Sequence, residues 1–329
     1  MKALFIGGTG NISGAVSRLA VQKGIDLYHL NRGTYKTDLK GITTINGDIN
    51  DPATFSDALS KHTWDVVVNW IAFTESEVDR DIQLFKGKTK QYIFISSASV
   101  YQKPLACPVV TESTPLCNPF WEYAQNKIKC EERLNKAYRE EKFPITIVRP
   151  SLTYDTVIPV SIGGFKEFTT ADRILKGKKI IIQGDGTSIW TVTHADDFAK
   201  GFVGLMDNDH ALGHAFHITS DELMTWNQIY LTVAEALGKE ARIVHIPSDF
   251  ICKTVGTYTG TLIGDKSESA IFDNSKIKSF VPEFKAVIPF KEGIRKTLAW
   301  FETHPERKFI NPKSNENIDL IINAYEAHD

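Results

Sequence analysis

The first half of the chain alternates short apolar runs with longer segments in which apolar residues recur at helical spacing. The apolar runs predict strands at residues 3–6, 26–30, 43–46, 66–70, 92–96 and 145–148. The segments between them predict helices around 13–23, 52–61, 75–86 and 122–139. Strands that alternate with helices are typical of βαβ units, so we expect an α/β fold with a doubly wound parallel sheet. The run at 66–68 is apolar without alternation, which is typical of a strand buried on both faces.

The pattern changes after residue 150, where Gly, Thr and Pro become frequent and the expected helices lie further apart. Helices are predicted at 197–206 and 226–237, with Asp196 or Asp197 as the N-cap of the first. The neighbouring His194 is expected to anchor the start of that helix rather than to act in catalysis. Because no repeat or low-complexity tract separates the two halves, we predict a smaller second lobe packed onto the sheet.

Composition narrows the function classes. The chain has 329 residues, of which 42% are hydrophobic, and 38 Lys and Arg against 40 Asp and Glu give a net charge of −2. Disorder and general nucleic-acid binding are therefore not expected. The four cysteines lie far apart without a C-x-x-C pair, so neither a metal site nor a disulfide framework is expected. No apolar stretch resembles a signal peptide or a membrane helix, and we expect a cytoplasmic protein. The cysteines are Cys107, Cys117, Cys130 and Cys252.

The segment after the first predicted strand has the composition of a dinucleotide-binding turn. It reads Gly7-Gly8-Thr9-Gly10-Asn11-Ile12-Ser13 and opens a predicted helix. Glycines let the backbone approach a pyrophosphate closely, and N–H groups at a helix start face its negative charge. The usual spacing is G-x-x-G-x-x-G, and here Ser13 stands at the third position, where a small residue still permits packing. The alternative is a glycine turn without a ligand. We predict cofactor contacts from Gly7, Gly10, Asn11 and Ile12.

Polar and aromatic residues follow three further strands, where open α/β sheets bind ligands. The second strand ends at Asn31 and Arg32. An acidic residue at this place would select NAD, whereas Arg favours the 2′-phosphate of NADP, so the sequence favours NADP mildly. An exposed arginine without a ligand is the alternative. Further candidate cofactor contacts are Asp48, Ile49, Trp70 and Ala72, each of which could instead be a turn or core residue.

Three polar residues form a candidate catalytic group. Ser97 closes the fifth predicted strand, and Tyr123 and Lys127 lie four residues apart on one face of a predicted helix. An ammonium and a nicotinamide cation beside the phenol would favour its ionised form. Tyr123 could then exchange a proton with a substrate hydroxyl while the carbon exchanges hydride with the cofactor. Ser97 would hold the same oxygen, and Lys127 would also reach the ribose. The alternative for an isolated Y-x-x-x-K is a solvated helix face.

With these motifs in order, the chain resembles the extended short-chain dehydrogenase/reductase superfamily, within it the NAD-dependent epimerase/dehydratase family. The resemblance continues through Arg149-Pro150-Ser151, Gly184-Asp185-Gly186 and Thr193-His194-Ala195-Asp196-Asp197. It implies a Rossmann domain, a C-terminal substrate domain of α/β type and a Ser97/Tyr123/Lys127 triad. It also implies a cofactor contact at Pro150 and a homodimer. We place the dinucleotide-binding domain at 1–155, with 190–206 packing back onto it, and the substrate domain at 156–329.

Departures from the family pattern bear on the substrate. Nucleotide-sugar 4,6-dehydratases place an Asp-Glu pair where this chain has Ala98 and Ser99, so a dehydratase is disfavoured. In many sugar-nucleotide epimerases an Arg after the G-D-G turn holds the diphosphate, and here Trp190 stands in its place. Lys266 could compensate, or it could be a surface lysine. The candidate substrate contacts are therefore Ser99, Trp190 and Lys266.

These observations predict an NAD(P)-dependent oxidoreductase or epimerase that acts on a hydroxyl or carbonyl of a sugar-like substrate, with a nucleotide sugar as one candidate. The expected partner is a small-molecule substrate, without a membrane or general nucleic-acid partner. The alternative is a non-catalytic dinucleotide sensor or RNA-associated regulator on the same fold. Such relatives usually keep the glycine turn and lose Tyr or Lys, whereas Tyr123 and Lys127 are both present here.

Overall fold

In the described part of the chain, six strands from the first half and one later strand form a seven-stranded sheet, and every neighbouring pair of its strands is parallel. The computed structural model describes residues 1–33, 40–51, 54–55, 59 and 62–327. The strand order is β12-β7-β5-β4-β1-β2-β3, so the chain begins near the middle and winds outward in both directions. The strands are β1 (Lys2–Ile6), β2 (Asp26–Asn31), β3 (Ile42–Asn46), β4 (Trp64–Asn69), β5 (Thr89–Ile95), β7 (Ile145–Arg149) and β12 (Ala215–His217).

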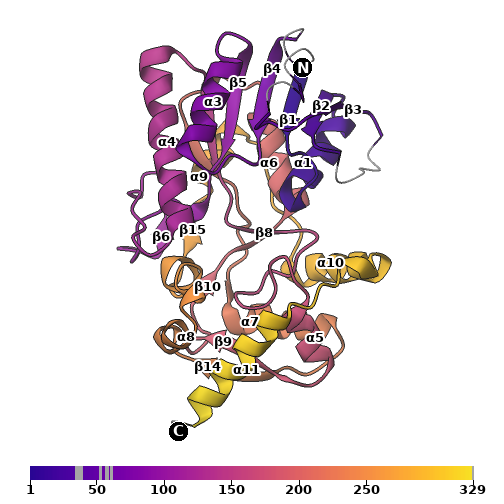
Figure 1. Cartoon of the computed structure of the whole chain (residues 1–329), viewed down its shortest axis with the longest axis vertical. Helices are drawn as coiled ribbons and strands as arrows, with labels where there is room; N and C mark the ends of the chain where they lie inside the picture. Colours follow the sequence, from indigo (N-terminus) through magenta and orange to yellow (C-terminus); the bar gives the residue numbers. More distant parts are fainter. Residues whose placement is uncertain (34–39, 52–53, 56–58, 60–61, 328–329) are drawn as a thin grey trace.

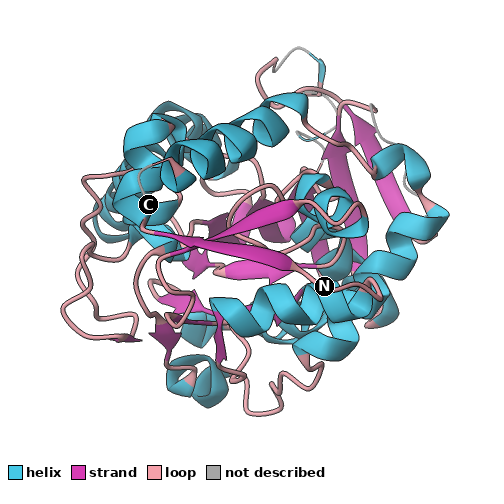
Figure 2. Cartoon of the chain, turned by 90° about the horizontal axis from the view of Figure 1, so that it is seen from below, coloured by secondary structure: helices cyan, strands magenta, loops and turns pink. Residues whose placement is uncertain are grey.

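Helices cover both faces of this sheet, as Figures 1 and 2 show. Because side chains alternate along a strand, β1 sends Ala3 and Phe5 to one face and Leu4 and Ile6 to the other. The first pair packs in the core beneath α1 and α6, the second in the core beneath α3 and α4. These four helices are α1 (Asn11–Gln22), α3 (Glu75–Phe85), α4 (Glu122–Glu141) and α6 (Ala195–Leu205). The predicted α/β fold with a doubly wound sheet is confirmed.

The six predicted strands are all present, with ends that differ by at most three residues. The seventh strand, β12, was not predicted, because three residues are too few to show a pattern. Most of the helix predicted at 52–61 lies outside the described residues.

The predicted N-cap of α6 is wrong. The helix begins at Ala195, and the cap is His194, whose Nδ1 accepts the N–H of Asp196 at 3.2 Å. Asp197 lies within the first turn, where its Oδ2 accepts two backbone N–H groups of residues 287 and 288. The prediction that His194 anchors the start of the helix is confirmed.

The second lobe gathers below the sheet in Figure 1. Its core includes Trp190 and Trp226, which stack with ring centroids 5.7 Å apart. Although α6 belongs to the second half of the chain, it packs against α1 of the first half. The domain boundary at 155 stays a prediction. The remaining strands are β6 (Val109–Val110), β8 (Leu152–Tyr154), β9 (Lys179–Gln183), β10 (Ile189–Trp190), β11 (Val192–His194), β13 (Met224–Thr225), β14 (Arg242–Ile246) and β15 (Ile271–Phe272). The remaining helices are α5 (Thr169–Leu175), α7 (Trp226–Ala236), α8 (Ser248–Thr254), α9 (Ser275–Phe280), α10 (Phe290–Thr303) and α11 (Pro312–Glu326).

Candidate active site

The turn between β1 and α1 requires glycine for two different reasons. Gly7 has φ +83°, a conformation that L side chains rarely adopt, and a Cβ there would lie 2.6 Å from Cγ2 of Ile71. Gly8 lacks a positive φ, but a Cβ there would lie 2.4 Å from Nε2 of His29. The backbone of this turn therefore lies directly against the side chains of β2 and of the loop after β4.

Ser13, at the place of a third glycine, closes the turn. Its Oγ accepts the N–H of Gly10 at 2.7 Å and donates to the carbonyl of Gly7 at 3.1 Å. The first helical bond of α1 runs from Gly14 N–H to Gly10 O, so the N–H groups of Asn11 and Ile12 precede the bonded part of the helix. The serine thus fixes the turn and leaves these N–H groups for an anion.

His29 forms the floor of the turn. It is fully buried, stacks on Phe5 and has its Nε2 2.9 Å from Oγ of Ser17. Because Ser17 donates its proton to the carbonyl of Gly8, its oxygen accepts from His29, which places the imidazole proton on Nε2. Burial lowers the pKa of His29 to about 4, so the ring is neutral at pH 7. A histidine on the inward face of β2 was the clue that sequence reasoning missed.

The side chain of Asn11 has a structural contact. Its Nδ2 donates to the carbonyl of Thr153 at 2.9 Å, and its Oδ1 accepts the N–H groups of Asp155 and Thr156 at 2.9 and 3.0 Å. The amide therefore ties the start of α1 to the segment after β8. At Asn11 the side chain is therefore committed to protein contacts, and the backbone N–H is the group left for a ligand.

The other predicted cofactor residues lie at the ends of β2, β3 and β4. Arg32 is exposed, and Asn31 and Asp48 are half-buried. Asp48 accepts the N–H of residue 50 through Oδ1 at 2.9 Å, whereas Ile49 is buried in the core beneath α3 and α4. The structure thus brings Asn31, Arg32 and Asp48 to one end of the sheet and turns Ile49 inward.

Trp70 packs against Phe5 and Phe202, with ring centroids 5.8 and 5.0 Å away. Its indole Nε1 is buried without a hydrogen-bond partner in the described part of the chain. Ala72 is fully buried, and its carbonyl is one of the two acceptors that hold Lys127.

Lys127 is a buried ammonium in a fixed position. Its Nζ donates to the carbonyl oxygens of Ala72 at 2.7 Å and Ile95 at 2.6 Å. The rings of Phe73 and Phe94 lie 4.5 and 4.7 Å from it, as centroid distances. Burial lowers the pKa of Lys127 to about 8. Two of its three N–H groups are used, and one remains for a ligand.

Tyr123 and Ser97 form a hydrogen-bonded pair beside this lysine. Oγ of Ser97 also accepts from Ser99, from the hydroxyl at 2.9 Å and from the backbone N–H at 3.2 Å. Burial raises the pKa of Tyr123, the hydrogen bond with Ser97 opposes this shift, and the negative charge of Asp265 adds to it. The expected lowering of this pKa is therefore not a property of the chain alone. The Lys127 Nζ lies 5.8 Å from the centre of the Tyr123 ring.

Ser97 and its neighbours are linked to a distant turn by Asn118, which sequence reasoning missed. This buried amide donates to the carbonyl of Ser99 at 2.7 Å and to that of Gly264 at 2.7 Å. Gly264 belongs to a π-helical turn at Leu262–Lys266. By holding this turn, Asn118 positions Asp265 near Tyr123. Asp265 is the second residue that sequence reasoning missed. An isolated asparagine before a predicted helix carries no signal of this contact.

The candidate substrate contacts are placed differently from one another. Nζ of Lys266 pairs with Asp265 at 2.5 Å and lies 6.0 Å from the ring centroid of Trp121, which packs on Tyr123. Trp190 is only 2% exposed and lies in the core of the second lobe. Ser99 is buried and bonded to Ser97.

Pro150 follows β7, and its carbonyl accepts the N–H of Ala98 at 2.8 Å. Within the described ranges, no cluster of His, Cys, Asp or Glu could hold a metal ion. No helix of the part that the structure describes is long and apolar enough to cross a membrane.

Comparison with known proteins decides the family. The sequence model of the NAD dependent epimerase/dehydratase family matches residues 3–85 and 82–219. The chain belongs to this family. The predicted resemblance is confirmed, and the match spans both the glycine turn and the Ser97/Tyr123/Lys127 group.

Individual relatives of this epimerase/dehydratase family member differ in function. A 2′-dehydrokanamycin reductase from Streptomyces kanamyceticus is 22% identical over 76% of this chain and 70% of its own length. The chloroplast stem-loop binding protein of 41 kDa b from Arabidopsis thaliana is 25% identical over 76% of this chain and 67% of its own. A UDP-glucuronic acid 4-epimerase from Bacillus cereus, solved with NAD, has a TM-score of 0.73 at 18% identity, covering 93% of this chain and 98% of that one. The last likeness establishes the fold.

Proposed function

We propose that this chain is an NAD(P)-dependent oxidoreductase or epimerase that acts on a hydroxyl or carbonyl of a sugar-like substrate. The observation that supports it most is the buried Lys127 ammonium, held by two carbonyls beside the hydrogen-bonded Tyr123 and Ser97. A solvated helix face, the alternative for these residues, would not bury an ammonium. Lysine is almost never fully buried unless its ammonium is paired, and perturbed pKa values cluster at functional sites.

The residues present fit a dinucleotide. Side chains are missing at Gly7 and Gly8, where a Cβ would collide with neighbours, and the N–H groups of Asn11 and Ile12 open α1. These groups would hold the pyrophosphate, and the free N–H of Lys127 would reach a ribose hydroxyl. When bound, the nicotinamide supplies the hydride acceptor or donor.

Arg32 supports the mild preference for NADP over NAD. It is exposed at the end of β2, where the adenosine ribose lies in dinucleotide-binding folds. Titration of the protein with both dinucleotides tests this preference. NADP is expected to bind more tightly, and an NAD affinity at least about tenfold higher, or 1.4 kcal/mol, would contradict it.

Tyr123 would move the proton in this reaction. Its phenol lies in a hydrogen bond with Ser97, which would hold the same substrate oxygen and stabilise the charged phenolate. Oxidation transfers the hydroxyl proton to Tyr123, and reduction returns it. The carbonyls of Ala72 and Ile95 fix the position of the Lys127 ammonium. From that position its positive charge would stabilise the phenolate.

Replacement of the phenol tests this role. Tyr123→Phe should lower turnover by about 10² to 10⁴-fold and leave the dinucleotide Kd within severalfold. Absorbance at 340 nm would follow 2′-dehydrokanamycin with NADH or NADPH, and nuclear magnetic resonance would follow UDP-glucuronic acid with NAD. Tyr138→Phe, an exposed position on the same helix, is the matched control. Unchanged turnover in Tyr123→Phe would refute the proposed role.

The choice among reactions rests on the chain's own residues. Ala98 and Ser99 offer no carboxyl group, and for this reason we disfavour a 4,6-dehydratase. Elimination of water from dTDP-glucose with NAD, assayed directly, would contradict that preference. A reductase would release its cofactor after each turnover, whereas an epimerase would keep it, so cofactor retained through gel filtration favours an epimerase.

A second candidate function is a non-catalytic dinucleotide sensor or RNA-associated regulator. The similarity to the chloroplast stem-loop binding protein supports it. Gel-shift titration with a stem-loop RNA at physiological salt distinguishes the two candidates. Tight binding without hydride transfer in the assays above would favour the regulator.

The division into domains 1–155 and 156–329 and the homodimer are also proposals. Analytical ultracentrifugation at micromolar concentration tests the dimer directly, and a sedimenting species of 36.9 kDa would contradict it. The expected cytoplasmic location is tested by fractionation of the source cells.

A further inference from the structure

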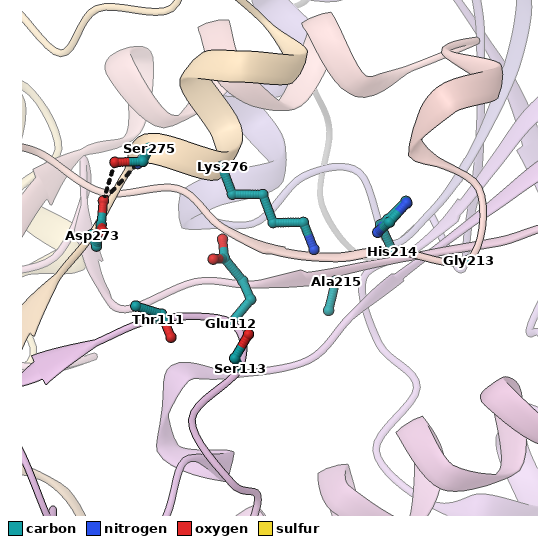
Figure 3. A pocket seen from close by; sticks show the side chains of 9 residues that line it. All are labelled: Thr111, Glu112, Ser113, Gly213, His214, Ala215, Asp273, Ser275 and Lys276. Atoms are coloured by element: carbon teal, nitrogen blue, oxygen red, sulfur yellow. Dashed lines mark hydrogen bonds between the residues drawn. The ribbon is translucent and has the colours of Figure 1, made fainter.

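A cavity of about 450 Å³ lies beside β12, the edge strand of the sheet, and shares no lining residue with the site around Tyr123. Three segments far apart in the chain form it, at 111–113, 213–215 and 273–276. Its volume lies in the range of small-molecule sites. Figure 3 shows the lining side chains, which are Thr111, Glu112, Ser113, Gly213, His214, Ala215, Asp273, Ser275 and Lys276.

Lys276 brings a positive charge to this cavity. Its side chain is half-buried, and its Nζ lies 4.9 Å from the centre of the Phe216 ring. Among the described residues its Nζ makes no hydrogen bond and no ion pair within 4.0 Å. Burial lowers the pKa of Lys276, the charge of Glu112 opposes this shift, and the charge of Arg149 adds to it. In Figure 3 its end lies between Glu112 and His214. An ammonium that burial has partly stripped of water is short of acceptors.

Two carboxylates line the same cavity, Glu112 from the segment at 111–113 and Asp273 from the segment that carries Lys276, and each keeps one oxygen free. Oε1 of Glu112 accepts the N–H of His217 at 3.2 Å, and the side chain is 8% exposed. Oδ1 of Asp273 accepts the N–H and the hydroxyl of Ser275, at 2.8 and 2.5 Å. The second oxygens, Oε2 of Glu112 and Oδ2 of Asp273, have no hydrogen-bond donor in the described part of the chain.

A buried imidazole holds both acidic residues in place. His217 donates from Nε2 to the carbonyl of Asp273 at 2.7 Å, so its Nδ1 accepts from the hydroxyl of Tyr101, 2.9 Å away. The same residue's backbone N–H holds Glu112. Both carboxylates are therefore positioned before any ligand arrives, which reduces the entropy cost of binding.

The charges decide what could bind. Burial lowers the pKa of His214, and the charge of Lys276 lowers it further, so His214 is neutral at pH 7. A simple anion at Lys276 would be repelled by two carboxylates, and a simple cation would be repelled by Lys276. A molecule with both charges satisfies all three groups. We propose that this cavity binds a small zwitterion, a molecule with a carboxylate for Lys276 and a primary ammonium for Glu112 and Asp273, as in a free amino acid.

Isothermal titration of the purified full chain tests the proposal with glycine, β-alanine and γ-aminobutyrate, which differ in the distance between their charges. Acetate and methylamine are the single-charge controls on the unaltered protein. At least one amino acid should bind with a Kd in the millimolar range, about tenfold more tightly than either single-charge probe. Absence of binding by all three at about 50 mM, or equal binding by acetate or methylamine, would overturn the proposal.

Two variants locate the site. Lys276→Met should weaken binding of that amino acid at least about tenfold, and so should Glu112→Gln, which keeps an oxygen for the N–H of His217. Lys278→Met removes a lysine from the same helix that pairs with Asp221 instead, and it should leave binding within twofold. Unchanged binding in either Lys276→Met or Glu112→Gln would refute the assignment. The outcome does not depend on the proposed dehydrogenase or epimerase activity.

Discussion

Two turns supply the candidate active site, and the hydrogen bonds that hold them differ in how far apart in the sequence their partners lie. The glycine turn at 7–10 is hydrogen-bonded by Ser13 and Ser17, which lie on the helix that follows it. His29, on the next strand, bonds to Ser17. The turn at 262–266 is held by Asn118, which bonds a carbonyl 146 residues away. The first turn is completed within one βαβ unit, whereas the second depends on the docking of two distant segments. Changes to the first should abolish dinucleotide binding, and changes to the second should alter the chemistry at Tyr123.

The largest effect is expected at Gly8. In Gly8→Ala the new Cβ would lie 2.4 to 2.7 Å from three atoms of the His29 ring, which is fully buried and cannot withdraw. We expect a loss of about 3 kcal/mol in the free energy of unfolding and of about 100-fold or more in dinucleotide affinity. Chemical denaturation and fluorescence titration measure these quantities.

A matched control and a compensating variant sharpen this prediction. Gly256→Ala adds a Cβ where nothing lies within 4 Å, and it should change neither quantity. The double variant Gly8→Ala/His29→Ala removes the collision, so it should recover part of the lost affinity. A single Gly8→Ala variant that binds the dinucleotide within twofold of the parent would contradict the contact.

The next effect concerns the pH dependence of stability. The folded pKa of His29 is lowered to about 4, whereas the unfolded value is near 6.5. Between these values the unfolded chain binds a proton that the folded chain does not, so stability falls as the pH falls from about 6.5 to 4. The integrated contribution is about 3 kcal/mol, and it is constant above and below that window.

His29→Gln isolates this contribution, because an amide does not titrate and can still donate to Ser17. Denaturant midpoints at pH 7.5 and pH 4 should show the variant gaining on the parent by about 3 kcal/mol at the lower pH. Substitution of His62, for which no such burial exists, provides the comparison. A variant whose stability tracks the parent at both pH values would show that His29 does not control this dependence.

The same contrast explains what the sequence could predict. Gly7, Gly10, Tyr123 and Lys127 could be predicted as site residues because each belongs to a motif of fixed spacing within one or two elements. The strands of the sheet could be predicted because they follow local patterns of burial. The roles of Ser13 and His29 were missed, although a polar residue on the inward side of β2 is visible in the sequence once the strand is assigned.

Asn118 and Asp265, which were also missed, had no local signal in the sequence, and the position of Trp190 had none either. Asn118 and the carbonyl of Gly264 that it holds lie 146 residues apart, and nothing in the residues around Asn118 or Asp265 indicates the contact. Trp190 was a candidate substrate contact by analogy of position, yet it stacks on Trp226 inside the second lobe. Long-range packing decides these cases, because it depends on side chains that no periodic pattern brings together.

A smaller effect is expected at Asn118. In Asn118→Ala the buried carbonyls of Ser99 and Gly264 lose their donor, which should cost about 2 kcal/mol of stability. Turnover should also fall, about tenfold, because Ser97 and Asp265 are no longer held together. Asn274→Ala, which removes a buried amide that makes more hydrogen bonds than Asn118 and lies elsewhere, is the control. It should lose stability without this loss of turnover, and equal turnover in both variants would refute a positioning role for Asn118.

The smallest effect is expected at Asp265, where a substitution should change the pH profile of turnover without changing dinucleotide affinity. The charge of Asp265 raises the pKa of Tyr123, in addition to the larger effect of burial, so Asp265→Asn should lower that pKa. If Tyr123 acts as the base in oxidation, the rise of kcat/KM with pH should move to lower pH in this variant. Asp185→Asn, at an exposed turn, should leave the profile in place. The dinucleotide Kd should stay unchanged in both, since the glycine turn is held independently. A profile that stays or moves to higher pH in Asp265→Asn would show that the 262–266 turn does not act on the phenol.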